Sequence, residues 1–152
     1  MIANLEHLSG AIADAAEKAL LQGMKRVQAD AKRLAPVDTG QLRNSITASV
    51  ERAPDGDIVG TVGTNAAHAA ANEFGSGPVG EASPKILPPG MKINYRKTGW
   101  VYKNLKTGNY VYTRGQAARP FLYPAFKQNQ DQIRENVAKA IRAAVKGGNQ
   151  DD

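Results

Sequence analysis

The residue types that most often carry out chemistry are sparse in this chain of 152 residues, and their spacing does not match a reaction centre. The chain has no Cys and two His, His7 and His68, which lie far apart in the sequence. His68 and Glu73 are five positions apart, which turns their side chains off a common helix face and does not match a zinc motif. Ser45 has no His or Lys partner placed by a known nucleophile motif. These residues predict neither a metal site nor a nucleophilic centre.

The remaining candidates for chemistry fit structural roles better. Asp55 and Asp57 flank Gly56, a pattern typical of a turn. The stretch Gly60–Thr64 lacks the Gly-Lys-Ser/Thr ending of a phosphate-binding loop, and glycines in a strand usually mark a bulge or a close approach of two backbones. We therefore expect a protein that is not an enzyme and needs no cofactor.

The most informative residues are instead two short motifs rich in Pro and Gly, Ala35–Ile46 and Ala118–Ala125. Such residues set the direction of the backbone, so each motif predicts a joint between elements. In the first, Pro36 biases Ala35 away from the helical region, so a helix should end near Leu34.

A short second helix should begin within this first joint. Asp38 and Gln41 have the spacing of a capping box, and Gly40 allows a turn or a close backbone contact. Leu42 and Ile46 should bury the turn against the core. The residues that we assign to the first joint are Pro36, Asp38, Thr39, Gly40 and Leu42.

The second joint should fix where the last helix begins. Pro124 suits the first turn of a helix, and Phe121 should be buried because large aromatic side chains dominate small cores. Glu73-Phe74-Gly75 forms a third motif, in which Gly75 would end a short helix. The residues assigned here are Glu73, Phe74, Gly75, Arg119, Pro120, Phe121 and Pro124.

The elements that position these motifs follow from the apolar pattern. Apolar residues separated by threes and fours predict one long amphipathic helix over 5–34, which Gly23 would loosen in its middle. Alternation predicts a hairpin at 46–62, and a second hairpin joins Trp100–Tyr102 to Tyr110–Tyr112. A short helix should span 65–74, and a last helix should begin near Pro124 and stop at Gly147-Gly148. The Gly/Pro-rich stretch 75–90 is unsuited to regular structure.

These elements predict an α+β fold, with a long N-terminal helix and a C-terminal helix packed on one face of an antiparallel β-sheet. A long basic loop and hairpin, rich in Gly and Pro in its first part, would project from it. We expect a single domain over residues 1–148, in which 76–117 is mobile, followed by an acidic tail at 149–152.

The positive charge is concentrated in one part of the chain. The formal net charge is +6, yet residues 82–130 carry nine basic side chains and no acidic one, so the rest of the chain carries −3. Such a block attracts polyanions or an acidic protein surface. The candidate partner-binding residues are Lys92, Arg96, Lys97, Trp100, Tyr102, Lys103, Lys106, Tyr110, Tyr112 and Arg114.

Three motifs in order, Ala35–Ile46, Glu73–Ser76 and Ala118–Phe126, resemble the small minor virion proteins of tailed phages. The family is that of head–tail joining or tail-completion proteins of the Hong Kong lambdoid phage type, and the resemblance spans residues 1–146. It implies a structural protein at the neck of the virion, assembled in the host cytoplasm, that joins the phage or prophage head to its tail.

The resemblance also implies partners. These are further copies of the chain in a homo-oligomeric ring (hexamer or dodecamer), head-side connector proteins, and a tail terminator or tail tube protein, without a membrane. DNA passing through the neck would be bound non-specifically at most. The alternative is a basic nucleic-acid-binding module in which Trp100, Tyr102, Tyr110 and Tyr112 stack on bases while lysines follow phosphates. We favour instead that these aromatic side chains pack within the hairpin.

Overall fold

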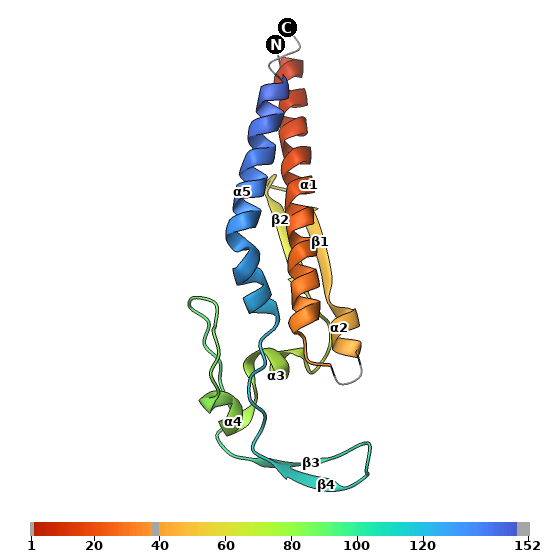
Figure 1. The fold of residues 1–152 in the computed structure, drawn as a ribbon, viewed down its shortest axis with the longest axis vertical. Helices are drawn as coiled ribbons and strands as arrows, with labels where there is room; N and C mark the ends of the chain where they lie inside the picture. Colours follow the sequence, from red (N-terminus) through yellow and green to blue (C-terminus); the bar gives the residue numbers. More distant parts are fainter. Residues whose placement is uncertain (1, 38–39, 149–152) are drawn as a thin grey trace.

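The computed structural model of the protein describes residues 2–37 and 40–148 (Figure 1). Its longest elements are two antiparallel helices, α1 (Ile2–Leu34) and α5 (Leu122–Gly148), which lie side by side. The antiparallel strands β1 (Thr47–Arg52) and β2 (Ile58–Gly63) pack against α1. The fold is α+β, as predicted. A second hairpin lies beyond the end of the helix pair at which α1 ends and α5 begins.

Helix α1 ends where Pro36 requires it to end. The N–H of Ala35 still donates to the carbonyl of Ala31 at 2.8 Å, and the helical spacing stops at Leu34 as predicted. Met24, Val27 and Ala31 from its apolar stripe are buried in the core. Helix α5 covers the same stripe along much of its length, so the two helices form the main packed layer.

The two helices pack closely at Gly23, which gives this residue a packing role in addition to the loosening of α1 that we expected. A Cβ placed on Gly23 would lie 2.7 Å from Cγ1 of Ile133 on α5. Both residues are buried. The absence of a side chain at Gly23 therefore allows the contact with α5. This contact offsets the loss of helix stability that a glycine within a helix causes.

Substitution of Gly23 by Ala should destabilise the protein, because the added methyl group overlaps Ile133. Overpacking of this kind costs about 1–3 kcal/mol, which exceeds the roughly 1 kcal/mol that Ala gains over Gly in a helix. Gly10 is the matched control, since nothing lies within 4 Å of a Cβ placed there in the same helix. Urea unfolding should show Gly10→Ala more stable than wild type and Gly23→Ala less stable; two equal gains in stability would contradict the packing argument.

A polar link also joins α1 to α5. The buried Asn129 donates through Nδ2 to Oδ2 of Asp30 at 2.7 Å and to the carbonyl of Ala125 at 2.9 Å. The hydrogen bond from Asn129 lowers the pKa of the Asp30 carboxyl below its usual value, with further help from Arg33 and Arg26 against a smaller opposing effect of burial. This link fixes the register of the two helices.

The β1–β2 pair turns one face to α1. The register pairs Ala48 with Val62 and Val50 with Gly60, and these residues face the core. The opposite face carries the polar side chains of Ser49 and Thr61 and remains exposed. The 46–62 hairpin is therefore confirmed, with its turn where Asp55 accepts from the N–H of Asp57 at 3.0 Å.

The smaller elements lie at the end of the helix pair where α1 ends and α5 begins (Figure 1). They are α2 (Gln41–Ser45), α3 (Ala69–Phe74), α4 (Gly77–Ala82), β3 (Trp100–Lys103) and β4 (Tyr110–Thr113). The second hairpin is confirmed, and it projects away from the helices. Helix α3 is shorter than the predicted 65–74, and α5 includes Gly147 and Gly148, at which we expected it to stop.

Candidate functional site

The Glu73-Phe74-Gly75 motif and the second joint meet at the N-terminus of α5. The carboxylate of Glu73 accepts hydrogen bonds from three consecutive N–H groups, those of Phe121 at 2.7 Å and of Leu122 and Tyr123 at 2.9 Å each. Glu73 is only 5% exposed. The first N–H groups of a helix have no partner within the helix and carry its positive dipole end, so a carboxylate there satisfies both the donors and the charge.

Backbone hydrogen bonds also join the segment 72–76 to the segment 116–119. Ser76 and Gln116 exchange hydrogen bonds of 2.9 and 3.1 Å, and the N–H of Arg119 donates to the carbonyl of Asn72 at 2.6 Å. The side chain of Gln116 donates to the carbonyl of Ala71 at 3.0 Å. The chain leading into α5 is thus held along α3 over several residues, which makes this joint a fixed connection.

Helix α4 corrects the expectation that residues 75–90 have no regular structure. Pro78 lies in its first turn, where a missing N–H costs nothing. The close packing depends on glycine: Gly75 has a φ of +78°, and a Cβ there would lie 2.6 Å from Cα of Gly80 and 2.9 Å from N of Ala118. Glycines that look like loop residues therefore bring three segments into contact.

The first joint is formed by the end of α1, by α2 and by the start of β1. Leu42 and Ile46 are buried, as predicted, and Gln28 of α1 donates to the carbonyl of Ile46 at 2.7 Å. Helix α2 begins at Gln41 after Gly40, which has a φ of +77°. Pro36 is half-buried. Because Gly40 is the N-cap of α2, Gln41 is the first residue of the helix and not its third, so the predicted capping box of Asp38 and Gln41 is wrong. Asp38 and Thr39 themselves lie outside the described residues.

The β3–β4 hairpin leaves its three tyrosine side chains exposed, contrary to the expectation that the aromatic residues pack within it, whereas Trp100 is half-buried. Residues directly opposite each other share a face, so Val101 and Tyr112 lie beside Lys103 and Tyr110. Tyr110 is 74% exposed and Tyr112 is 65% exposed. The other face, with Trp100 and Tyr102, is less exposed. One face of the hairpin thus presents apolar and aromatic surface to solvent.

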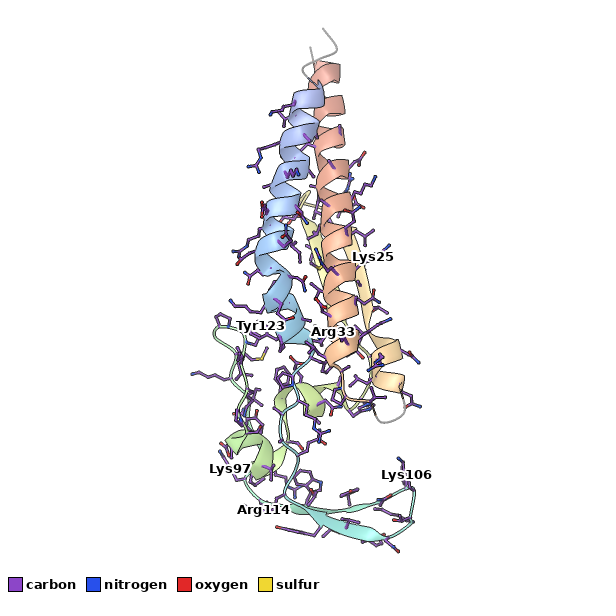
Figure 2. All side chains as sticks on the ribbon, viewed as in Figure 1. Lys25, Arg33, Lys97, Lys106, Arg114 and Tyr123 are labelled. Carbon is purple, nitrogen blue, oxygen red and sulfur yellow. The ribbon has the colours of Figure 1, made fainter. Side chains whose placement is uncertain are left out.

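The basic candidates are exposed, and some of them also contact other side chains of the chain. Lys97 pairs with Glu81, and the guanidinium of Arg96 lies 5.3 Å from the centre of the Trp100 ring. Lys92, Lys103 and Arg114 are exposed. Figure 2 shows Lys106 at the tip of the hairpin, and Lys97 and Arg114 at its base. The structure therefore brings the hairpin candidates together on one projection.

Two cavities flank the joints. The first is an apolar groove of about 560 Å³ between β2, α1, α3 and α5. The second, of about 630 Å³, is polar, and His68, Asn72, Gln116 and Arg119 line it beside the first joint. Within the described residues, no group of three or more His, Cys, Asp or Glu side chains is arranged to hold a metal ion.

Sequence reasoning assigned Glu73 and Phe121 to joints but missed that they contact each other. A signal was present: none of the residues just before α5, Ala118-Arg119-Pro120-Phe121, is a Ser, Thr, Asp or Asn that could cap the helix. A helix without a capping residue of its own needs a hydrogen-bond acceptor from elsewhere in the chain. Glu73, the acidic residue of the Glu73-Phe74-Gly75 motif, was a candidate for that acceptor.

Comparison with known protein families supplies the identity. The sequence model of the family described as "Bacteriophage HK97-gp10, putative tail-component" matches residues 1–75. The chain belongs to this family. It is a component of a phage virion, of the HK97 gp10 type. No curated protein and no solved structure matches the chain.

The match ends at Gly75, within the Glu73-Phe74-Gly75 motif that contacts the start of α5. It includes α1, α2, both strands of the first sheet and α3 with Glu73, whereas α4, the β3–β4 hairpin and α5 follow it. The residues that Glu73 binds therefore lie outside the matched part. In the described part of this HK97 gp10-like chain, no helix is long and apolar enough to cross a membrane.

Proposed function

We propose that this tail component completes the phage tail and joins it to the DNA-filled head at the neck. It would do so as a closed homo-oligomeric ring that contacts head-side connector proteins and the tail terminator or tube. Membership of the HK97 gp10-like family carries the proposal, because that family is one of tail components. The action is binding and assembly, without turnover of a substrate.

The architecture supports a binding role. A fixed joint, held by Glu73 and by the Ser76–Gln116 bridge, sets the position of an exposed basic hairpin relative to the helix pair. Rings form from heterologous contacts between a projection on one subunit and a different surface on the next. A helix pair with one projecting hairpin has this form. The exposure of Tyr110 and Tyr112 keeps nucleic-acid binding as the second candidate function.

Deletion of the gene should leave filled heads and complete tails that fail to join. The expected result is a loss of infectious particles by orders of magnitude, with free heads and free tails visible by electron microscopy of lysates. Addition of the purified protein to such a lysate should restore joined particles. A deletion strain that yields normal infectious particles would show that the protein has a different role in the virion.

A further inference from the structure

The outer edge of β2 is an open strand edge beside the apolar groove. Strand β2 pairs with β1 on one side, in a sheet of two strands. Five consecutive residues of the chain here, Gly60–Thr64, line the groove. Alternate residues of a strand face opposite sides of a sheet, so a consecutive run marks an edge. Helix α1 contributes Met24 and Val27 to the groove, and α5 contributes the partly exposed Phe126.

The β3–β4 hairpin is a pair of strands with one uncovered face. A two-stranded hairpin is at best marginally stable in water unless a third strand or a helix covers it. The face that carries Val101, Tyr110 and Tyr112 is exposed, and no helix packs on it among the described residues. Its strands of four residues match the length of the open β2 edge at Gly60–Gly63.

The charges of the two surfaces are complementary. At the end of the sheet where β2 begins, Glu51, Asp55 and Asp57 are exposed, and Arg52 is engaged by Asp14 and Glu17 of α1. Glu51, Asp55 and Asp57 thus present negative charge at this end, where the charge of Arg52 is already paired with two carboxylates. The hairpin carries Lys103 and Lys106 near its tip and lies within the 82–130 segment, which has no acidic residue.

We infer that the β3–β4 hairpin of a second copy of this chain pairs with the open edge of β2 and extends the sheet to four strands. Strand β3 lies next to β2 and runs antiparallel to it. Because β2 starts at the acidic turn and β3 runs toward the hairpin tip, this arrangement brings the tip, with Lys103 and Lys106, to the end of the sheet that carries Glu51, Asp55 and Asp57. The inference rests on the proposed self-assembly of this tail component and names the contact between its subunits.

A second copy fits these observations better than DNA does. A nucleic acid would neutralise the lysines but would leave the β2 edge and the apolar groove uncovered. Strand addition satisfies the open backbone groups of both edges, and the groove accepts the apolar face of the hairpin. The contact joins two different surfaces, so successive copies form a ring or a filament.

Disulfide formation tests the pairing directly, because the chain has no Cys of its own. One full-length variant carries Thr61→Cys on β2 and a second carries Tyr102→Cys on β3. Antiparallel pairing of Gly60–Gly63 with Trp100–Lys103 places Tyr102 opposite Thr61, on the face away from α1, when the apolar face of the hairpin enters the groove. Mixing them under oxidising conditions, or with a short bis-maleimide that tolerates a one-residue shift, should give a covalent dimer at twice the 16.2 kDa chain mass. Neither variant alone should do so to a comparable extent.

The matched control is Ser49→Cys, which lies directly opposite Thr61 on β1 and is also exposed. It should give at least tenfold less cross-linked dimer with Tyr102→Cys, since β1 is separated from the hairpin by β2. Equal cross-linking at positions 49 and 61, or none at position 61 in either the purified protein or virions that carry both variants, would overturn the inference.

Charge reversal tests the orientation. Lys103→Glu with Lys106→Glu should abolish self-association in sedimentation experiments, and Glu51→Lys with Asp57→Lys should do the same. A mixture of the two reversed proteins should associate again, because the sheet end of one now complements the hairpin of the other. If the hairpin reversals instead abolish only the retention of DNA and leave self-association unchanged, the hairpin is a nucleic-acid element and the inference is wrong.

The results separate this inference from the proposed function. A cross-link between positions 61 and 102 together with normal particles from the deletion strain would retain the subunit contact and reject head–tail joining. Unjoined heads and tails from the deletion strain, together with no cross-link at position 61, would retain head–tail joining and reject the contact.

Discussion

Glu73→Ala is expected to lower the free energy of unfolding by about 3–4 kcal/mol, because it removes the acceptor of three N–H groups at the start of α5. A hydrogen bond to a charged group contributes about 1.5–3 kcal/mol, and the buried N–H of Phe121 would be left without a partner. Water can reach the less buried Tyr123 N–H, so the three contributions do not add fully. The melting temperature should fall by roughly 10 °C, at about 2–4 °C per kcal/mol for a chain of this size.

Two further variants show that the carboxylate itself is responsible. Glu73→Gln keeps the shape and one carbonyl acceptor but places an NH₂ group against N–H donors, so about half of the loss should remain. Glu81→Gln is the matched control, since Glu81 is exposed and paired only with Lys97 at the surface, and its effect should stay within about 0.5 kcal/mol. Calorimetry that finds Glu73→Ala as stable as Glu81→Gln would contradict the role assigned to this carboxylate.

The local elements could be predicted from the sequence because each has a local cause. The end of α1 follows from Pro36, the first hairpin from alternating residues around a turn, and the burial of Phe121 from its size. In each case the deciding residues are within a few positions of the element. Apolar periodicity also indicated that α1 and α5 are amphipathic. Amphipathic helices bury their apolar faces, and in this fold α1 and α5 do so against each other.

The features that were missed depend on contacts between distant residues. Glu73 and the N–H of Phe121 are 48 positions apart, and no local pattern states that one caps the other. Helix α4 forms in a Gly/Pro-rich stretch because Gly75 and Gly80 pack against each other and against Ala118. The role of Gly23 became clear only with Ile133 beside it. Tertiary contact overrides local propensity at each of these positions.

The aromatic hairpin shows a different limit of sequence reasoning. Alternation of Tyr with Val correctly predicted two paired strands, and the rule that such residues must be buried then favoured packing within the chain. The structure exposes Tyr110 and Tyr112 instead. Surface that is unburied in one copy is a property of the assembly, which the pattern of a single chain does not specify.

Phe121→Ala is expected to have the largest effect on stability of any single apolar substitution in the second joint. Phe121 is fully buried at 0% exposure and packs in the core with Val27 and Ile46. Truncation of a buried Phe to Ala costs about 3–5 kcal/mol, because the transfer energy is lost and a cavity remains. The cavity would open directly beside the N–H groups that Glu73 binds, so the start of α5 should loosen as well.

The matched control for this substitution is Phe126→Ala, which lies five residues further on, within α5, and is 40% exposed. Its cost in dilute, unassociated protein should be about 1 kcal/mol, because much of its side chain already contacts water. Phe121→Ala should therefore unfold at a much lower temperature than Phe126→Ala, and hydrogen exchange should show the first turn of α5 losing protection. A soluble Phe121→Ala protein as stable as the Phe126→Ala protein would show that the core does not depend on Phe121 and that the joint is held by Glu73 and the surrounding backbone hydrogen bonds.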